Sequence, residues 1–224
     1  MERSDDASRD DAEVDQMVDE IVAESASPTA EALFAAHGRG GVRVHWSPTP
    51  EQLPLEGHRI LLKYWLGARD AAAIPPVSAI DPFPLRPVLG NLMILEPLDG
   101  GADFRFRLYG TAIAEAARFD WSGSTLSEMQ RILKGPGPKF FRATYRALLR
   151  RPEPLYTESP AVVVFTARAW GRLILPFGAP GMIARILVGN YVVSDDVLSD
   201  DEERRLEALR AEMQAAREKT REKD

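Results

Sequence analysis

The chain of 224 residues contains no cysteine, and only three of its residues are histidines. The absence of cysteine excludes disulfide bonds, thiolate nucleophiles and cysteine-based metal sites. The histidines His37, His45 and His58 do not stand at metal-ligand spacing from carboxylates, as in the H-E-x-x-H pattern. We therefore expect no metal site and no covalent cofactor.

Long apolar runs are also missing. No apolar stretch approaches the roughly 18 residues that a membrane-spanning helix needs. The first 16 residues, MERSDDASRDDAEVDQ, have no apolar signal region. We expect a cytoplasmic protein that does not associate with membranes.

Motifs for catalysis are absent as well. The glycine-rich stretches LDGGAD and KGPGPK lack the spacing of a phosphate-binding loop, and no catalytic residue can be named. One alternative is a small enzyme that uses the carboxylates scattered over predicted strand ends and loops. These are Asp81, Glu96, Asp103, Glu115, Asp120 and Glu128.

The net charge of −6 is unevenly distributed. Residues 1–24 hold ten acids and two bases, and residues 199–224 hold nine acids and seven bases, so the body between them is mildly basic. A protein that binds nucleic acid along its whole chain is usually basic throughout its domain. The charge distribution therefore argues against a nucleic-acid partner.

The first 56 residues are rich in Asp, Glu, Ser and Ala and then in Gly and Pro, which is typical of a largely disordered tail. One amphipathic helix can form within it, because apolar residues recur at helical spacing. They are Val14, Met17, Val18, Ile21 and Val22. Such a helix either stays isolated and frayed or docks on a partner surface.

Residues 57–197 form the predicted folded domain. The segment 58–71 predicts a helix, and residues 91–98 and 103–110 predict a β-hairpin around the turn DGGAD. Short helices follow, and then the amphipathic helix that starts in GPGPK. Three further strands are predicted over residues 161–170, 172–177 and 182–193, with WG and GAPG as turns.

Residues 198–224 predict a C-terminal helix with acids in its first turn. Leu206, Leu209 and Met213 form an apolar seam at heptad-like spacing, which makes them candidate interaction residues. The predicted fold is thus α+β, with a five-stranded antiparallel sheet, helices mostly on one face, a flexible N-terminal tail and a C-terminal helix.

This order of elements resembles that of a PAS domain, and particular residues strengthen the resemblance. Tyr64 and Trp65 lie in the leading helix, Asp81 and Pro82 in a proline-rich segment, and Leu175 and Pro176 late in the sheet. The stretch from Phe104 to Thr111 and the later Gly123 complete the pattern. The resemblance covers roughly residues 58–194. Over this range the sequence resembles a sensory or regulatory PAS family found mainly in alphaproteobacteria.

The stretch DFRFRLYG, residues 103–110, alternates apolar with polar residues and predicts a half-buried strand. In ligand-binding PAS domains the interior between sheet and helices is a cavity, so the resemblance implies a pocket there. A fully packed core is the other interpretation. The candidate pocket residues are Phe104, Phe106, Leu108, Ile113, Trp121, Tyr145, Leu173, Leu175, Ile183 and Leu187.

The alternation puts Arg105, Arg107 and Tyr109 on the opposite face of the same strand, and Arg168, Arg172 or Arg185 can join them. Arginine stems pack well beneath a covering element while their heads stay hydrated. We expect either a solvated face or a cover formed by one of the acidic terminal helices, in cis or from a second subunit.

A second basic surface lies on the predicted helix that ends at Arg151. Arg142, Arg146 and Arg150 repeat every four residues, and residues 131–151 hold seven bases and no acid. An anionic partner and a solvated helix face are both compatible with this pattern.

Taken together, the resemblance implies a sensory or regulatory module that acts through a protein partner, with a small ligand in the core as a possible trigger. A ligand-free PAS adaptor is the first alternative. A homodimer is a possible assembly. Light sensing through a cysteine-bound chromophore is excluded, and the sequence names no other cofactor.

Overall fold

The computed structural model describes residues 2–24, 26–69, 72–161 and 167–195, together with the isolated positions 204, 208, 211, 212 and 215. Its centre is a six-stranded antiparallel sheet with the order β1-β4-β5-β6-β2-β3. The strands are β1 (Arg43–Trp46), β2 (Leu92–Leu98), β3 (Asp103–Tyr109), β4 (Leu155–Pro160), β5 (Ala167–Ala179) and β6 (Met182–Asp195).

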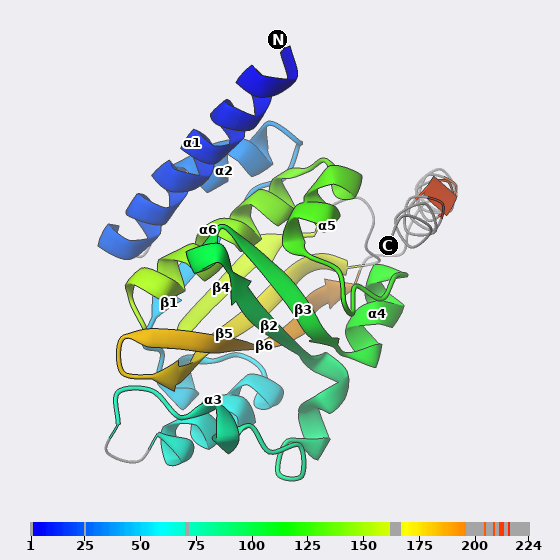
Figure 1. Cartoon of the computed structure of the whole chain (residues 1–224). Coiled ribbons are helices and arrows are strands. Elements are labelled where there is room, and N and C mark those ends of the chain that lie inside the picture. Colours follow the sequence, from blue (N-terminus) through cyan, green and yellow to red (C-terminus); the bar gives the residue numbers. More distant parts are fainter. Residues whose placement is uncertain are drawn as a thin grey trace.

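Helices cover both faces of this sheet (Figure 1). On one face lie α4 (Thr111–Ala117), α5 (Leu126–Leu133) and α6 (Pro136–Arg150), with α1 (Glu2–Glu24) and α2 (Pro28–Ala35) outside α6. On the other face lies α3 (Glu56–Ala68). The expectation that helices lie mostly on one face is thus confirmed for the described residues, and α3 is the exception, since it packs its apolar side against β5 and β6.

Short 3₁₀ turns connect these elements. They are η1 (Pro50–Gln52), η2 (Val77–Ala79), η3 (Arg86–Asn91) and η4 (Asp99–Gly101). The first three lie in proline-rich sequence. Proline fixes its own φ angle and has no backbone N–H to donate, so such sequence forms short turns and not a long helix or a central strand.

The structure differs from the expectation of a largely disordered N-terminal segment. Within residues 2–56 it places α1, α2, β1 and η1, and β1 extends the predicted five-stranded sheet to six strands by pairing with β4. The docked form of the N-terminal helix is the one observed, since Val14, Met17, Val18 and Ile21 are all completely buried. The composition predicted disorder because the segment is polar and cannot bury its apolar stripe by itself. In the folded chain α6 supplies the surface that covers this stripe.

Two strand assignments are also corrected. The predicted strands 161–170 and 172–177 belong partly to one long strand, β5, which continues through Gly171, and residues 162–166 lie outside the described part of the chain. Gly171 is not a turn residue. A Cβ there would lie 2.8 Å from the Val193 side chain and 3.0 Å from the Tyr156 hydroxyl, so the glycine permits close packing inside the sheet. The strand β4 was missed.

The hairpin of β2 and β3 is confirmed, but it contains a bulge. Leu95 pairs with Phe106 and Ile94 pairs with Leu108, so Arg107 is the extra residue on β3. The bulge ends the alternation that the sequence predicted. Leu108 turns outward and is 37% exposed, whereas Tyr109 turns inward and is buried.

His58 fastens α3 to the sheet. Its side chain is completely buried, its Nε2 lies 3.2 Å from the Gly189 carbonyl oxygen, and its ring packs edge-on against Tyr156 and Tyr191. Nearby, Trp65 donates from Nε1 to the Pro176 carbonyl at 2.8 Å. Burial lowers the pKa of His58 to about 4, because a charged imidazole loses its hydration there.

This burial predicts a pH-dependent stability. The unfolded chain binds a proton to His58 below its ordinary pKa of 6.5, whereas the folded chain binds it only near pH 4, so acidification between these values favours unfolding. We expect the unfolding free energy of the wild type, taken relative to that of His58→Phe, to fall by about 3 kcal/mol from pH 7.5 to pH 4. Urea denaturation across this range measures it.

An exposed position that does not titrate provides the control, because Leu66→Phe should leave the pH dependence of the wild type unchanged. Equal pH slopes for the wild type and His58→Phe would show that His58 is protonated as easily in the folded state as in the unfolded state.

Candidate functional site

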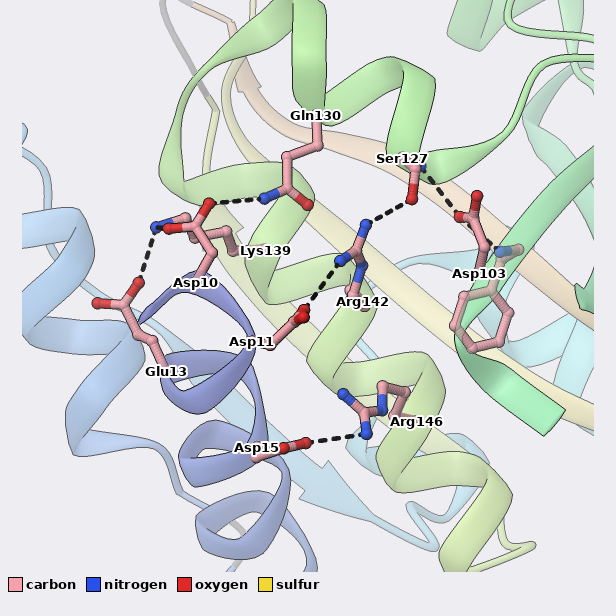
Figure 2. Close-up of polar contacts among 11 residues, drawn as sticks. Asp10, Asp11, Glu13, Asp15, Asp103, Ser127, Gln130, Lys139, Arg142 and Arg146 are labelled. Atoms are coloured by element: carbon pink, nitrogen blue, oxygen red, sulfur yellow. Dashed lines mark hydrogen bonds and ion pairs between the residues drawn. The ribbon is translucent and has the colours of Figure 1, made fainter. Parts of the chain in front are cut away.

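The outer face of α6 and the acidic side of α1 form a continuous set of ion pairs, which we call the clasp. The two helices run parallel. From the ion pair of Arg142 to those of Arg146 and Arg150, both helices advance by four residues at each step, so the partners stay level with one another along the helix axes. Figure 2 shows the upper part of the clasp. The pairs are Lys139 with Asp10 at 2.6 Å and with Glu13 at 2.8 Å, Arg142 with Asp11 at 3.6 Å, Arg146 with Asp15 at 2.9 Å, and Arg150 with Asp19.

The predicted interaction residues Arg142, Arg146 and Arg150 therefore do meet an anionic partner, and it is the chain's own N-terminal helix. A cover by an acidic terminal helix was expected for the sheet face of Arg105 and Arg107, but the N-terminal helix α1 lies on the other side of the sheet, over α6. A cover of that sheet face by the C-terminal helix lies outside the described residues and stays a prediction. On that face Glu96 binds both Arg107 at 3.3 Å and Arg185 at 3.0 Å.

Arg142 connects the clasp to the domain interior. It is the most buried of the three clasp arginines, and its Nη2 donates to Ser127 Oγ at 2.8 Å. The Ser127 amide in turn donates to Asp103 Oδ1 at 3.0 Å, which also accepts from the Phe104 amide at 2.8 Å. A polar path thus runs from α1 through α6 and α5 to the start of β3 (Figure 2).

Apolar packing supplies most of the free energy that holds α1 in place. The four buried side chains of its stripe each contribute on the order of 2 kcal/mol, whereas an exposed ion pair contributes at most about 1 kcal/mol. The Trp46 indole also donates from Nε1 to the Ile21 carbonyl at 2.8 Å. We infer that the stripe gives the clasp its strength and that the ion pairs set its register.

Glu20 holds the turn between α1 and α2. Its carboxylate accepts hydrogen bonds from Ser27 Oγ at 2.9 Å and from the Thr29 amide at 3.1 Å, and it also accepts from the Thr29 hydroxyl. Burial raises the pKa of Glu20, but the hydrogen bonds from Thr29 and Ser27 outweigh burial and leave the pKa below its ordinary value. The carboxylate is therefore charged when α1 is docked.

The predicted pocket residues are divided between the two faces of the sheet. Phe104, Phe106, Ile113, Trp121 and Tyr145 are buried on the α6 side, and Leu173, Leu175 and Leu187 are buried on the α3 side. Ile183 is partly buried, and Leu108 faces outward because of the bulge. No single cavity can be lined by all ten, since side chains alternate between faces along each strand.

On the α6 side the interior retains a small cavity of about 20 Å³, which is enough for one water-sized molecule. Its lining is Met93, Phe106, Tyr109, Met129, Phe141, Tyr145, Trp170, Arg172 and Asn190. Among the polar members of this lining, Tyr109 and Arg172 were expected on the other face of the sheet, and Asn190 was not predicted at all. The bulge in β3 moves Tyr109 inward, and the register of β5 directs Arg172 toward α6.

A larger hollow of about 860 Å³ opens to solvent between α2, β1 and η1. It is a groove along the sheet edge, and the amides of Gly41 and Val42 in it already bind the Glu31 carboxylate. Small-molecule sites are typically concave, mostly apolar pockets of about 300–1,000 Å³ that enclose most of the ligand, so the open groove and the small interior cavity both lack the form of such a site.

Five of the six carboxylates proposed for the enzyme alternative have structural partners, and Glu115 is exposed. Asp81 Oδ1 accepts from the Phe83 amide, Asp120 Oδ1 accepts from the Ser122 amide, and Glu128 accepts from the Thr125 amide in a capping box. Among the described residues, no group of three His, Asp or Glu side chains is arranged to hold a metal ion. No helix in the described part is long and apolar enough to cross a membrane.

The remaining interaction residues Leu206, Leu209 and Met213 lie outside the described residues, and their seam stays a prediction.

Substitutions in α1 can test the separate roles of the apolar stripe and the ion pairs. Ile21→Ala should weaken the docking of α1 by about 2–4 kcal/mol through the lost apolar contact, and Asp15→Asn by at most about 1 kcal/mol. Hydrogen exchange measured on peptides that cover α1 reports both values. The exposed Gln16→Ala on the same helix is the control and should change exchange little. Equal effects of Asp15→Asn and Ile21→Ala would contradict the assigned roles.

The family model for the PAS domain matches residues 56–134, which run from the start of α3 to the end of α5. No curated protein matches the chain. Among solved structures, one similar chain is that of an RNA-binding light-oxygen-voltage receptor. It is 13% identical, the match covers 99% of this chain and 68% of that chain, and the TM-score is 0.35.

The family match covers less than half of the chain, and it supports the N-terminal part of the resemblance, which was expected over roughly residues 58–194. The matched segment contains α3, β2, β3, α4 and α5, and β2 pairs with β6, which follows it in the chain. Residues 56–134 are thus similar to a PAS domain, and they lie within an α+β fold.

Proposed function

We propose that this chain is a sensory or regulatory PAS module that acts through protein–protein interaction, with α1 as the element that a signal releases. The observation that carries the proposal is the clasp, in which an acidic amphipathic helix covers the basic outer face of α6. A PAS domain supports a sensory or regulatory role in general.

The docked helix α1 is suited to replacement by a partner helix, because it is joined to the domain through a short connection. After α2 the chain enters β1, so α1 and α2 form an N-terminal unit that contributes no strand to the six-stranded sheet. Release of α1 would uncover apolar surface next to Lys139, Arg142, Arg146 and Arg150. A large apolar patch beside charged groups is typical of an interaction site.

The partner that fits this surface is a protein helix with the pattern of α1. It would carry acids every four residues and an apolar stripe beside them, so that it could replace α1 on α6. Charge complementarity of this kind selects partners and speeds association more than it adds affinity. A signal would then shift the equilibrium between docked and released α1.

The nearly filled interior favours a ligand-free adaptor as the second candidate function. A cavity of about 20 Å³ accommodates no cofactor of the size of a flavin or haem in this conformation. In that case, competition between helices for α6 would itself be the switch. A cytoplasmic location and a homodimer stay predictions, and native mass spectrometry of the full chain measures the subunit number.

The proposal predicts competition between α1 and an acidic helix supplied in trans. The probe is a fluorescent peptide with the sequence of residues 2–24, and the variant is the full chain with Asp11→Asn, Asp15→Asn and Asp19→Asn. We expect the peptide to bind this variant about tenfold more tightly than the wild type, because three weakened ion pairs sum to roughly 1.4 kcal/mol. Fluorescence anisotropy measures the two affinities.

A matched control carries the same charge change at exposed acids outside α1, as Glu51→Gln, Asp99→Asn and Glu115→Gln. It should bind the peptide as weakly as the wild type does. A peptide with Asp11, Asp15 and Asp19 replaced by Asn should bind the variant about tenfold more weakly than the acidic peptide does. If the clasp variant and the control bound the acidic peptide equally, α6 would not be the exchange surface.

A further inference from the structure

Arg172 is a completely internal arginine with no acidic partner in the described chain. It lies in the middle of β5 on the face toward α6, between the buried Trp170 and Ile174, and only 1% of its surface is exposed. No carboxylate of the described residues forms an ion pair with it. Its Nη2 donates to the Tyr145 hydroxyl, and its Nη1 has no hydrogen-bond partner among those residues.

The arginine is the centre of a buried polar row. Strand pairing aligns Thr157 of β4 with Arg172 and Arg172 with Asn190 of β6. All three side chains are buried, and within the described chain Thr157 Oγ1 and Asn190 Oδ1 also lack hydrogen-bond partners. Buried polar atoms are nearly always hydrogen-bonded, and Arg172 Nη1 is a donor, so it lacks an acceptor that an anion or a water would supply. Asn190 Oδ1 only accepts, so it needs a donor such as water and does not itself indicate an anion.

Neighbouring groups compensate the charge only in part. The guanidinium carbon lies 3.9 Å from the centroid of the Phe141 ring and 5.1 Å from that of Tyr145. Such contacts contribute less than the removal of an unpaired charge from water costs. Burial also raises the pKa of both Tyr109 and Tyr145, so neither phenol supplies a negative charge near neutral pH.

We infer that the cavity beside Arg172 binds one small monovalent inorganic anion, of the size of a halide or nitrate. The anion would accept a hydrogen bond from the free Arg172 Nη1 and occupy the space of about 20 Å³ among Phe106, Tyr109 and Asn190. A water molecule would fill the same space but would leave the charge uncompensated. A larger anion would exceed the space of the cavity. A divalent anion would exceed the single positive charge of Arg172.

This inference deepens the proposed function, because α6 contributes to both sites. Phe141 and Tyr145 face the cavity, and Arg142 and Arg146 on the same turns face the clasp. Binding beside Arg172 would therefore act on the helix that α1 covers. The anion site itself stands on its own geometry and is tested without reference to α1.

The test compares thermal unfolding of the full chain in sodium chloride, bromide and nitrate with unfolding in sodium gluconate and sulfate at equal ionic strength. A ligand that binds only the folded state raises the unfolding midpoint with increasing concentration. We expect such a rise for the three small anions and none beyond general salt effects for gluconate and sulfate. Arg172→Met should abolish the rise, and the partly exposed Arg105→Met should retain it.

A methionine at position 172 fills similar volume without a charge, so Arg172→Met should fold in a buffer without small anions. If it does not fold, bromide-soaked crystals of the wild type decide the question through an anomalous peak beside Arg172 Nη1. Water only at that position, or a rise that persists in Arg172→Met, would overturn the inference. A rise without any change in hydrogen exchange of α1 would uphold the anion site and reject only its coupling to the clasp.

Discussion

The position of α6 between the sheet and α1 is the constraint on which the rest of this structure depends. Its inner side contributes Phe140, Tyr145 and Leu148 to the main core, and its outer side carries the basic residues of the clasp. A helix that is buried on two sides and basic on one needs a cover that is both apolar and acidic. The N-terminal helix meets both needs, which explains why so acidic a segment is ordered against the domain.

The same helix also limits what the interior can hold. Aromatic side chains from α6 and β3 fill most of the space that the sheet and helices enclose, with Phe104 packed against Tyr145 and Phe34 against Phe140. The polar row centred on Arg172 crosses this apolar layer. Since an uncompensated charge is costly in such a layer, the interior has a chemical requirement that its apolar lining alone would not suggest.

Much of the fold could be predicted from periodicity and turn residues. The leading helix, the hairpin of β2 and β3 and the amphipathic α6 follow directly from apolar spacing, proline at a helix start and glycine in a turn. The pairing of acids with Arg142, Arg146 and Arg150 was predicted only as a class of partner, because charge patterns identify complementary surfaces without saying which of them meet. The apolar stripe of α1 was visible, but its docking required a surface that forms only when α6 is in place.

The sequence by itself determined the absence of thiol chemistry, the type of most elements, the PAS resemblance and the two oppositely charged helix faces, since all of these depend on local composition and spacing. Only the tertiary structure decided the interior environment of Arg172, His58 and Tyr109. A one-residue bulge reverses which side chains of β3 face inward, and strand register places Thr157, Arg172 and Asn190 in one row. These are long-range pairings between strands, so the neighbours of each residue along the chain do not reveal them.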